Sequence, residues 1–227
     1  MGDMFGGGLF GKKNGADGKN PVIMGGGSLP GGEYNSVNFI GGGTVDGSLK
    51  ADKVSVAGRV SISGSLQAQV VEASGKLSVR DTAEVRNLKL SGYARIGGET
   101  VADNIEIAGF AEFDKEVKAE KFSSSGGFEI GESLCAEIIF CELNGKASAV
   151  EITGKHITVR RGDSDMSERG LAADSIEGEV IMLQDTHATL VRGNKITVGK
   201  GCRIGRIEYR ESLAVEDGGV VGEQIKI

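Results

Sequence analysis

The amino-acid sequence predicts an all-β fold: a single-domain parallel β-helix in which the chain winds into stacked three-stranded coils. The first observation is a glycine that recurs every seventeen residues from Gly41 to Gly126. The second is the pattern after each glycine, where apolar residues at offsets two, four, eight, ten, thirteen and fifteen form three apolar-x-apolar pairs. Three short half-buried strands per repeat, stacked on the equivalent strands of the next repeat, build a β-helix.

Composition agrees with a narrow tube. The chain has 227 residues with 38 Gly, 2 Pro and no Trp, and only 5% of its residues are aromatic, so thin layers of Val, Ile, Leu and Ala must form the interior. The repeat extends through most of the chain, which favours one elongated solenoid of about ten coils over two globular domains. Each coil depends on its neighbours for burial, so the two end coils are the weakest.

Residues 1–36 do not follow the repeat and are crowded with glycine, which predicts a flexible N-terminal tail. Four apolar residues in this segment stand close to two lysines: Met4, Phe5, Leu9 and Phe10 with Lys12 and Lys13. Apolar side chains that enter a bilayer, beside lysines that meet anionic headgroups, predict a weak peripheral membrane anchor. The alternative is a disordered spacer whose apolar residues have no role.

The β-helix is predicted over residues 37–227, beginning with Val37 and Phe39, which stand at the offsets of a last strand before Gly41. The offset-ten position carries only Ala or Val, which predicts a tight corner in each coil. It is occupied by Ala51, Ala68, Val85, Ala102, Ala119 and Ala136. A charged segment at about 160–172 predicts a polar loop that leaves the stack. The cadence resumes near Ile196, so one solenoid spans both halves of the chain.

Charge and cysteine content exclude several classes. The net charge of −6 and the absence of a basic stripe argue against nucleic acid as a partner. Three cysteines, an odd number, predict a reducing compartment rather than a disulfide framework. No apolar run has the length of a membrane span or of a secretory signal, so the expected location is cytoplasmic.

The sequence predicts no enzyme site, cofactor site or metal site. Acyltransferases built on stacked hexapeptide coils use histidines as bases or metal ligands, and this chain has only His156 and His187, far apart and without partners at ligand spacing. An acyltransferase is therefore a remote alternative. Polysaccharide hydrolases on larger β-helices need clustered acids around a cleft, and only the 160–172 segment offers a long loop.

The opening Gly58-Arg-Val-Ser-Ile-Ser-Gly64, the following Leu66-x-Ala68 step and the seventeen-residue coils resemble the bactofilin family. The N-terminal Met4-Phe5 and Phe10-Gly-Lys-Lys13 are similar to that family's membrane-targeting segment. The resemblance implies a right-handed β-helix that polymerises end to end without nucleotide, often on the inner membrane, as a scaffold for cell-shape, envelope or motility processes. The chain departs from the family's pattern in its longer solenoid, its inserted loop and its lack of proline-rich flanks.

The open ends of a β-helix expose unpaired backbone groups over an apolar layer, which predicts self-association at both ends. The expected contact residues are Val37, Phe39 and Val45 at the leading end and Val221, Ile225 and Ile227 at the trailing end. The alternative function is a soluble adaptor that presents one wall of the rod and the 160–172 loop to a partner protein, such as an envelope or motility protein.

Overall fold

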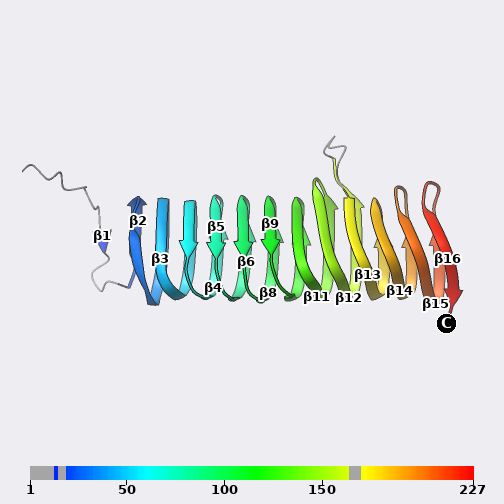
Figure 1. Ribbon diagram of the computed structural model, residues 1–227, viewed down its shortest axis with the longest axis horizontal. Coiled ribbons are helices and arrows are strands. Elements are labelled where there is room, and N and C mark those ends of the chain that lie inside the picture. The colour runs from blue at the N-terminus through cyan, green and yellow to red at the C-terminus, as the bar shows by residue number, and fades with distance from the viewer. Residues whose placement is uncertain (1–12, 15–18, 164–169) are drawn as a thin grey trace, which may run out of the picture.

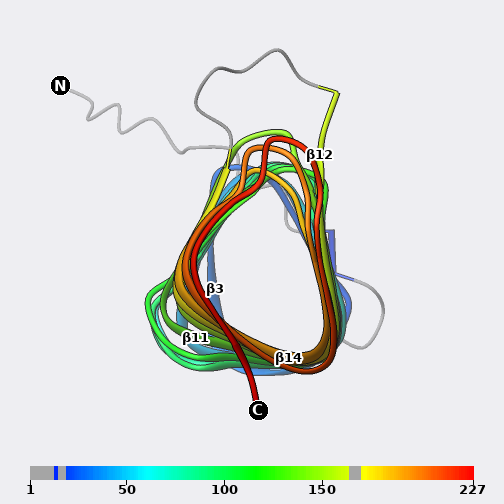
Figure 2. The same ribbon diagram turned by 90° about the vertical axis from the view of Figure 1, so that its right-hand side faces the viewer.

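The computed structural model describes residues 13–14, 19–163 and 170–227 and shows an all-β chain wound into a parallel β-helix of about 12 turns. Figure 1 shows the turns stacked side by side into a rod, and Figure 2 shows the rounded triangular outline of one coil seen along the axis. The predicted fold class is confirmed, with more turns than the ten expected. Within the described ranges, no helix has the length and apolar character needed to span a bilayer.

Among the described strands, all pairings are parallel except that of β1 with β2, and each strand between the two ends pairs with the equivalent strand one coil before and one coil after it. The strands are β1 (Lys13–Asn14), β2 (Pro21–Gly25), β3 (Ser28–Ile62), β4 (Leu66–Ala73), β5 (Lys76–Val79), β6 (Ala83–Leu90), β7 (Tyr93–Ile96), β8 (Thr100–Ile107), β9 (Phe110–Phe113), β10 (Val117–Ser124), β11 (Gly127–Leu143), β12 (Lys146–Arg161), β13 (Gly170–Leu183), β14 (Thr186–Val198), β15 (Arg203–Val215) and β16 (Val220–Lys226).

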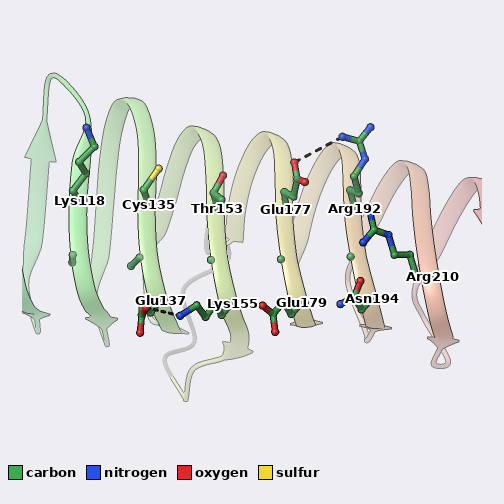
Figure 3. Close-up of a pocket in the computed structure, with 15 residues that line it drawn as sticks. Lys118, Cys135, Glu137, Thr153, Lys155, Glu177, Glu179, Arg192, Asn194 and Arg210 are labelled. Carbon is green, nitrogen blue, oxygen red and sulfur yellow. Dashed lines mark hydrogen bonds and ion pairs between the residues drawn. The ribbon is translucent and has the colours of Figure 1, made fainter. Parts of the chain in front are cut away.

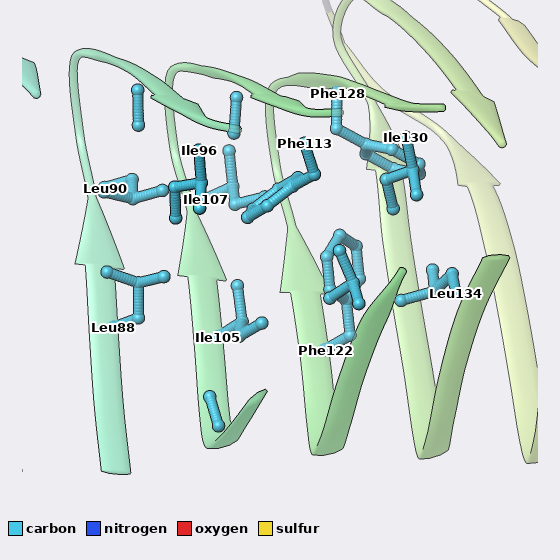
Figure 4. Packing of buried hydrophobic residues seen from close by; sticks show 14 of the residues in the cluster. Leu88, Leu90, Ile96, Ile105, Ile107, Phe113, Phe122, Phe128, Ile130 and Leu134 are labelled. Atoms are coloured by element: carbon cyan, nitrogen blue, oxygen red, sulfur yellow. The ribbon is translucent and has the colours of Figure 1, made fainter. Parts of the chain in front are cut away.

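The inward positions are those that the repeat predicts. In the coil that follows Gly75, six apolar residues have side chains at most 2% exposed: Leu77, Val79, Ala83, Val85, Leu88 and Leu90. Figure 4 shows how equivalent residues stack from coil to coil to form one continuous core. Phe128 stands in an inward column whose neighbouring members are alanines. Its ring packs edge-on against the ring of Phe122, with the ring centres 5.1 Å apart.

The periodic glycines are explained by close contact between neighbouring coils. A Cβ atom on Gly109 would collide with the carbonyl oxygen of Gly92, and one on Gly92 would collide with that of Gly75. The same carbonyls accept backbone hydrogen bonds from the next coil, for example from Phe110 N–H to Gly92 O at 2.9 Å. A side chain at this position would break the coil-to-coil hydrogen bond, so glycine is the only residue that fits.

The predicted tight corner is also present. Its small residues continue beyond Ala136 as Gly154, Gly178 and Gly193, which the register aligns in one column. A Cβ atom on Gly178 would lie 2.5 Å from the carbonyl oxygen of Gly154. The corner therefore admits only the smallest residues in these later coils.

The predicted boundary between tail and β-helix at residue 37 is wrong, because regular coils begin at β2. Strand β2 pairs with β3 in a register that joins Val22 to Asn38, and Leu29 is only 3% exposed. The first step is thus sixteen residues, one fewer than the repeat. That shorter step, together with the glycines around it, hid this coil from the sequence pattern.

The second half of the rod keeps the three-stranded coil but varies its length. Register steps are eighteen residues from Ile139 to Ile157, twenty-four from Ile157 to Ile181 and fifteen from Ile181 to Ile196. The long step holds the predicted polar segment, since β12 ends at Arg161 and β13 begins at Gly170. Insertions at a corner lengthen a coil without moving its inward residues, which explains why the exact spacing is lost after Leu143.

Candidate functional site: the rod ends and a corner groove

The C-terminal end of the rod carries an open strand edge. Strand β16 pairs with β15 on one side and with no other strand of the described chain. Val220 and Ile227 are 60% and 54% exposed, and Ile225 is half-buried. The last inward layer is only partly covered, and its half-buried members pack against the core: Tyr209, Leu213 and Val221. This end therefore combines unpaired backbone groups with exposed apolar surface.

The N-terminal end is partly occupied. Ile23 of β2 and Tyr34 pack against the core while half-exposed, and Met24 is 58% exposed. Strand β1 pairs antiparallel with the outer edge of β2 through two positions, Lys13 with Val22 and Asn14 with Pro21. The rest of this edge has no partner strand among the residues described.

The predicted leading-end residues are wrong as an assembly edge. Val37, Phe39 and Val45 are at most 1% exposed, because the coil that contains β2 covers them. They are core residues, and the register joins Ile23 to Phe39. The signal that the sequence analysis missed is the apolar run around Ile23, sixteen residues before the equivalent run around Phe39.

The predicted trailing-end residues lie in the last coil, but only Val221 continues an inward column, that of Ile204, whereas Ile225 continues the outward column of Glu208. Val221 and Ile225 belong to β16, and the N–H of Ile227 donates a hydrogen bond to the carbonyl of Tyr209 at 2.9 Å. Of the predicted membrane anchor, Met4, Phe5, Leu9, Phe10 and Lys12 lie outside the described residues. Lys13 is placed only through its backbone pairing in β1.

A groove of about 700 Å³ follows the tight corner along the second half of the rod (Figure 3). Its floor is the small-residue column Ala119, Ala136, Gly154, Gly178 and Gly193. Figure 3 shows the two walls as rows of outward side chains. One row is Lys118, Cys135, Thr153, Glu177 and Arg192, and the other is Glu137, Lys155, Glu179 and Asn194, with Arg210 at the C-terminal end. The groove exists because the small corner residues do not fill the space between the two rows of longer flanking side chains.

Many charges along these walls are paired between neighbouring coils. Lys155 Nζ lies 2.5 Å from Glu137 Oε1, and this hydrogen bond holds the pKa of Glu137 below its ordinary value. Arg192 Nη1 lies 3.8 Å from Glu177 Oε2. Exposed pairs of this kind contribute little free energy each, but a misaligned coil would set like charges opposite one another.

A tighter charge network lies just beyond the groove. The carboxylate of Glu208, a residue only 8% exposed, accepts hydrogen bonds from Arg192 Nε at 2.8 Å and Arg206 Nη2 at 2.6 Å. The hydrogen bond from Arg192 is the main cause that lowers the pKa of Glu208. This network joins three successive coils at the C-terminal end, since Arg206 also approaches Glu223 at 3.7 Å.

The cysteine thiols and the histidine imidazoles do not lie together in one site. Burial raises the pKa of Cys135 and raises that of Cys141 to about 12, so both thiols are protonated at neutral pH and are poor nucleophiles. Register places His156 beside Val180 and His187 beside Ala172, on different walls of the rod. Within residues 13–14, 19–163 and 170–227, no group of three or more metal-binding side chains gathers.

No protein-family model matches the chain, and no solved structure matches it. Two curated proteins of Bacillus subtilis (strain 168) are similar to part of it. The uncharacterized protein YhbF is 39% identical over 79 residues, and the uncharacterized protein YhbE is 38% identical over 88 residues. These segments cover 34% and 36% of this chain, and 34% and 37% of the relatives, so the chain spans about a third of the curated relatives that it matches.

Proposed function

We propose that the protein is a structural, self-assembling rod of the bactofilin type, whose copies join end to end into filaments without nucleotide. The observation that carries the proposal is the C-terminal edge of β16, where an unpaired strand borders exposed apolar residues. A soluble solenoid ordinarily hides such an edge under a capping element. In the part of the chain that the structure describes, no helix covers it.

Strand addition is the interaction that fits this end. A second copy that continues the coil satisfies the free N–H and C=O groups of β16 and covers the partly exposed inward residues Leu213, Val215 and Val221. Such a junction continues the coil-to-coil register of the β-helix itself. It needs no nucleotide or metal, because backbone hydrogen bonds and apolar burial supply its free energy.

The scaffold is proposed to act in the cytoplasm, at the inner face of the membrane, in cell-shape, envelope or motility processes. This location is supported by the N-terminal apolar and lysine residues of the sequence and by the resemblance to bactofilins. One such short segment binds weakly, so the anchor becomes effective only through the many copies of a filament.

The decisive experiment compares the wild-type protein with Val215→Arg by negative-stain electron microscopy and analytical ultracentrifugation. We expect long filaments from the wild type and short, folded species from the variant, because Val215 continues the inward column of Val198 and is 42% exposed in the monomer, so the charge lies in the proposed junction. The matched control is Val101→Arg, at an exposed position in mid-rod. Unchanged filaments from Val215→Arg would remove the C-terminal end from the mechanism.

The corner groove favours one alternative, a soluble adaptor that binds a partner protein along its walls. The two functions predict assemblies of different mass. A scaffold sediments as a broad, very large species, and an adaptor sediments as a small defined oligomer. The same ultracentrifugation run therefore decides between them.

A further inference from the structure

The first strand of the chain lies at the N-terminal end of the rod. Strand β1 pairs with the outer edge of β2, with Lys13 opposite Val22 and Asn14 opposite Pro21 (Figure 1). The inner edge of β2 is paired with β3 in the parallel register of the coils. Because β1 runs antiparallel to β2, it is not a further turn of the β-helix. It is a separate segment on the edge where the stack of coils ends.

The chain is fixed to the rod between β1 and β2. The carbonyl of Lys19 accepts hydrogen bonds from the N–H groups of Asn35 at 2.9 Å and Ser36 at 3.3 Å. The hydroxyl of Ser36 also donates to the side-chain oxygen of Asn20 at 2.9 Å. Strand β1 is therefore tethered within a few residues of the edge that it occupies, and its local concentration there does not depend on the concentration of the protein.

Burial along β2 decreases where its pairing with β1 ends. Pro21, opposite Asn14, is buried, whereas Ile23, on the same inward face two residues later, is half-buried. At residues 23–25, no strand of the described chain pairs with the outer edge of β2. Strand β1 therefore closes one part of this edge and leaves the remainder open to another strand.

The pairing of β1 is small enough to be displaced. It covers two positions, and Pro21 has no N–H group to donate. A second copy that continues the coil can pair along the whole of β2, which spans Pro21–Gly25, and cover the half-buried Ile23. Both occupants need the same N–H and C=O groups of β2, because the other edge of β2 is bonded to β3. They therefore exclude each other, whichever direction the strand of the second copy runs.

Filament growth needs two free ends on every copy. Within the described ranges, the outer edge of β16 has no partner strand, so the C-terminal end is open. A copy whose N-terminal edge is occupied can join one neighbour only, and assembly stops there. We infer that β1 is an autoinhibitory strap that must leave β2 before a second copy can join the N-terminal end. This inference rests on the proposed end-to-end assembly.

The strap sets the protein concentration at which filaments form. Pairing between β1 and β2 is intramolecular, whereas pairing with a second copy becomes more favourable as the concentration rises. Below a threshold concentration the strap keeps the end closed, and above it the larger contact of a second copy displaces the strap. A strap of two paired residues therefore raises this threshold without preventing assembly.

The first test removes the pairing in the full chain. Lys13→Pro together with Asn14→Pro removes both N–H groups of β1. The matched control, Gly7→Pro with Gly8→Pro, makes the same change earlier in the chain. Sedimentation over a range of protein concentrations measures the threshold for assembly. We expect a threshold about tenfold lower than that of the wild type for the β1 variant, and an unchanged threshold for the control.

The second test locks the strap in place. Lys13 and Val22 are opposite each other, and opposite residues of an antiparallel pair lie within the Cα separation that a disulfide spans. Lys13→Cys with Val22→Cys is oxidised with copper phenanthroline in a Cys135→Ser background, which removes the half-buried thiol. We expect the oxidised protein to form nothing larger than a pair of rods, and dithiothreitol to restore filaments. Cys135→Ser alone, oxidised in the same way, should keep its filaments.

The outcomes separate the strap from the assembly itself. Filaments of the oxidised variant that are as long as those of the reduced protein would overturn the strap and leave end-to-end assembly intact. Equal thresholds for the wild type and the proline variant of β1 would do the same. A higher threshold for that variant would also overturn the strap, because β1 would then belong to the junction. Absence of filaments from the wild type and from every variant, at all concentrations, would overturn both proposals.

Discussion

At single positions, the molecule is constrained most strongly where neighbouring coils touch through their backbones. Gly109 faces the carbonyl oxygen of Gly92 so closely that no Cβ atom fits between them. Gly26, in the first coil, has no heavy atom within 4 Å of the place where its Cβ would stand. Gly109 therefore does not tolerate a side chain, whereas Gly26 does. The difference arises from contact with the neighbouring coil rather than from backbone conformation.

We expect Gly109→Ala to lower the free energy of unfolding by about 1–3 kcal/mol, because the added methyl group pushes two coils apart. Gly26→Ala should leave it unchanged to within about 0.5 kcal/mol. Urea unfolding followed by circular dichroism measures both. Equal stability of the two variants would show that the coils are not in close contact at the glycine column.

The ionisation of Glu208 predicts the direction in which the stability of the fold changes with pH. Its pKa is lowered in the folded chain, chiefly by the hydrogen bond from Arg192, from an ordinary value of 4.5. The ionised group therefore stabilises the fold above about pH 4.5, and this contribution is lost as the pH falls through the lower, folded pKa.

Glu208→Gln should therefore be less stable than the wild type at neutral pH, and the difference should shrink as the pH falls below about 4.5. Denaturant midpoints measured at pH about 7 and about 3 give the comparison. The control is Glu120→Gln, at an exposed position, which reports the effect of removing one surface charge. A difference in denaturant midpoint between Glu208→Gln and the wild type that does not change with pH would mean that the arginines do not stabilise the ionised carboxylate.

At the scale of elements, the two ends of the rod differ. Among the residues that the structure describes, no strand pairs with the outer edge of β16, whereas the outer edge of β2 carries β1 at two positions. Strand β1 therefore lies at the N-terminal end of the rod, beside the edge that a further copy would have to pair with. The sequence predicts a membrane contact for residues 4–13, and this stays a prediction.

Deleting residues 2–13 should release the protein from anionic liposomes without dissolving polymers, because the deletion removes the apolar residues and lysines but leaves β2 and β16. Co-sedimentation with liposomes and electron microscopy of the same sample provide the two readouts. A milder control, Lys12→Glu with Lys13→Glu, should weaken binding most at low salt. Liposome binding that survives the deletion would make the segment a spacer.

At the scale of the whole molecule, stability is shared between neighbouring coils rather than concentrated in one core. Gly75 and Gly92 are equivalent positions, and register joins Leu66 to Ala83 and Ala83 to Thr100 in one column. Removal of one complete repeat therefore places the coils on either side in a register that already exists in the protein.

Deletion of residues 76–92 should give a folded rod shorter by about 4.8 Å, with a lower unfolding temperature because one set of interfaces is lost. Circular dichroism and small-angle X-ray scattering on a Val215→Arg background test this. Deletion of residues 76–83, about half a coil, should not fold, since it sets inward residues against outward ones. If both deletions fold equally well, the coils are not equivalent units.

The sequence alone determined the coil. Three apolar pairs in seventeen residues are a local pattern that every coil repeats, so the inward positions from Leu49 to Leu143 follow directly from the spacing. The glycine period and the small corner residues were likewise visible, because a solenoid repeats the same steric demand in every coil. Counting the same cadence placed Val221 correctly in the final inward layer, but it put Ile225 one position off, since the register joins Ile225 to Glu208 and joins Gln224 to the core residue Ile207.

Only the tertiary structure decided where the rod begins and which outward residues meet. The first step of sixteen residues brings Ile23 over Phe39, which turned the predicted leading edge into core. Steps of eighteen and twenty-four residues bring Ile138, His156 and Val180 into one column. Coil lengths vary because corners accept insertions at little cost, while stacked strands must stay aligned to keep their hydrogen bonds. Surface neighbours are therefore set by register, which a residue count through unequal coils does not supply.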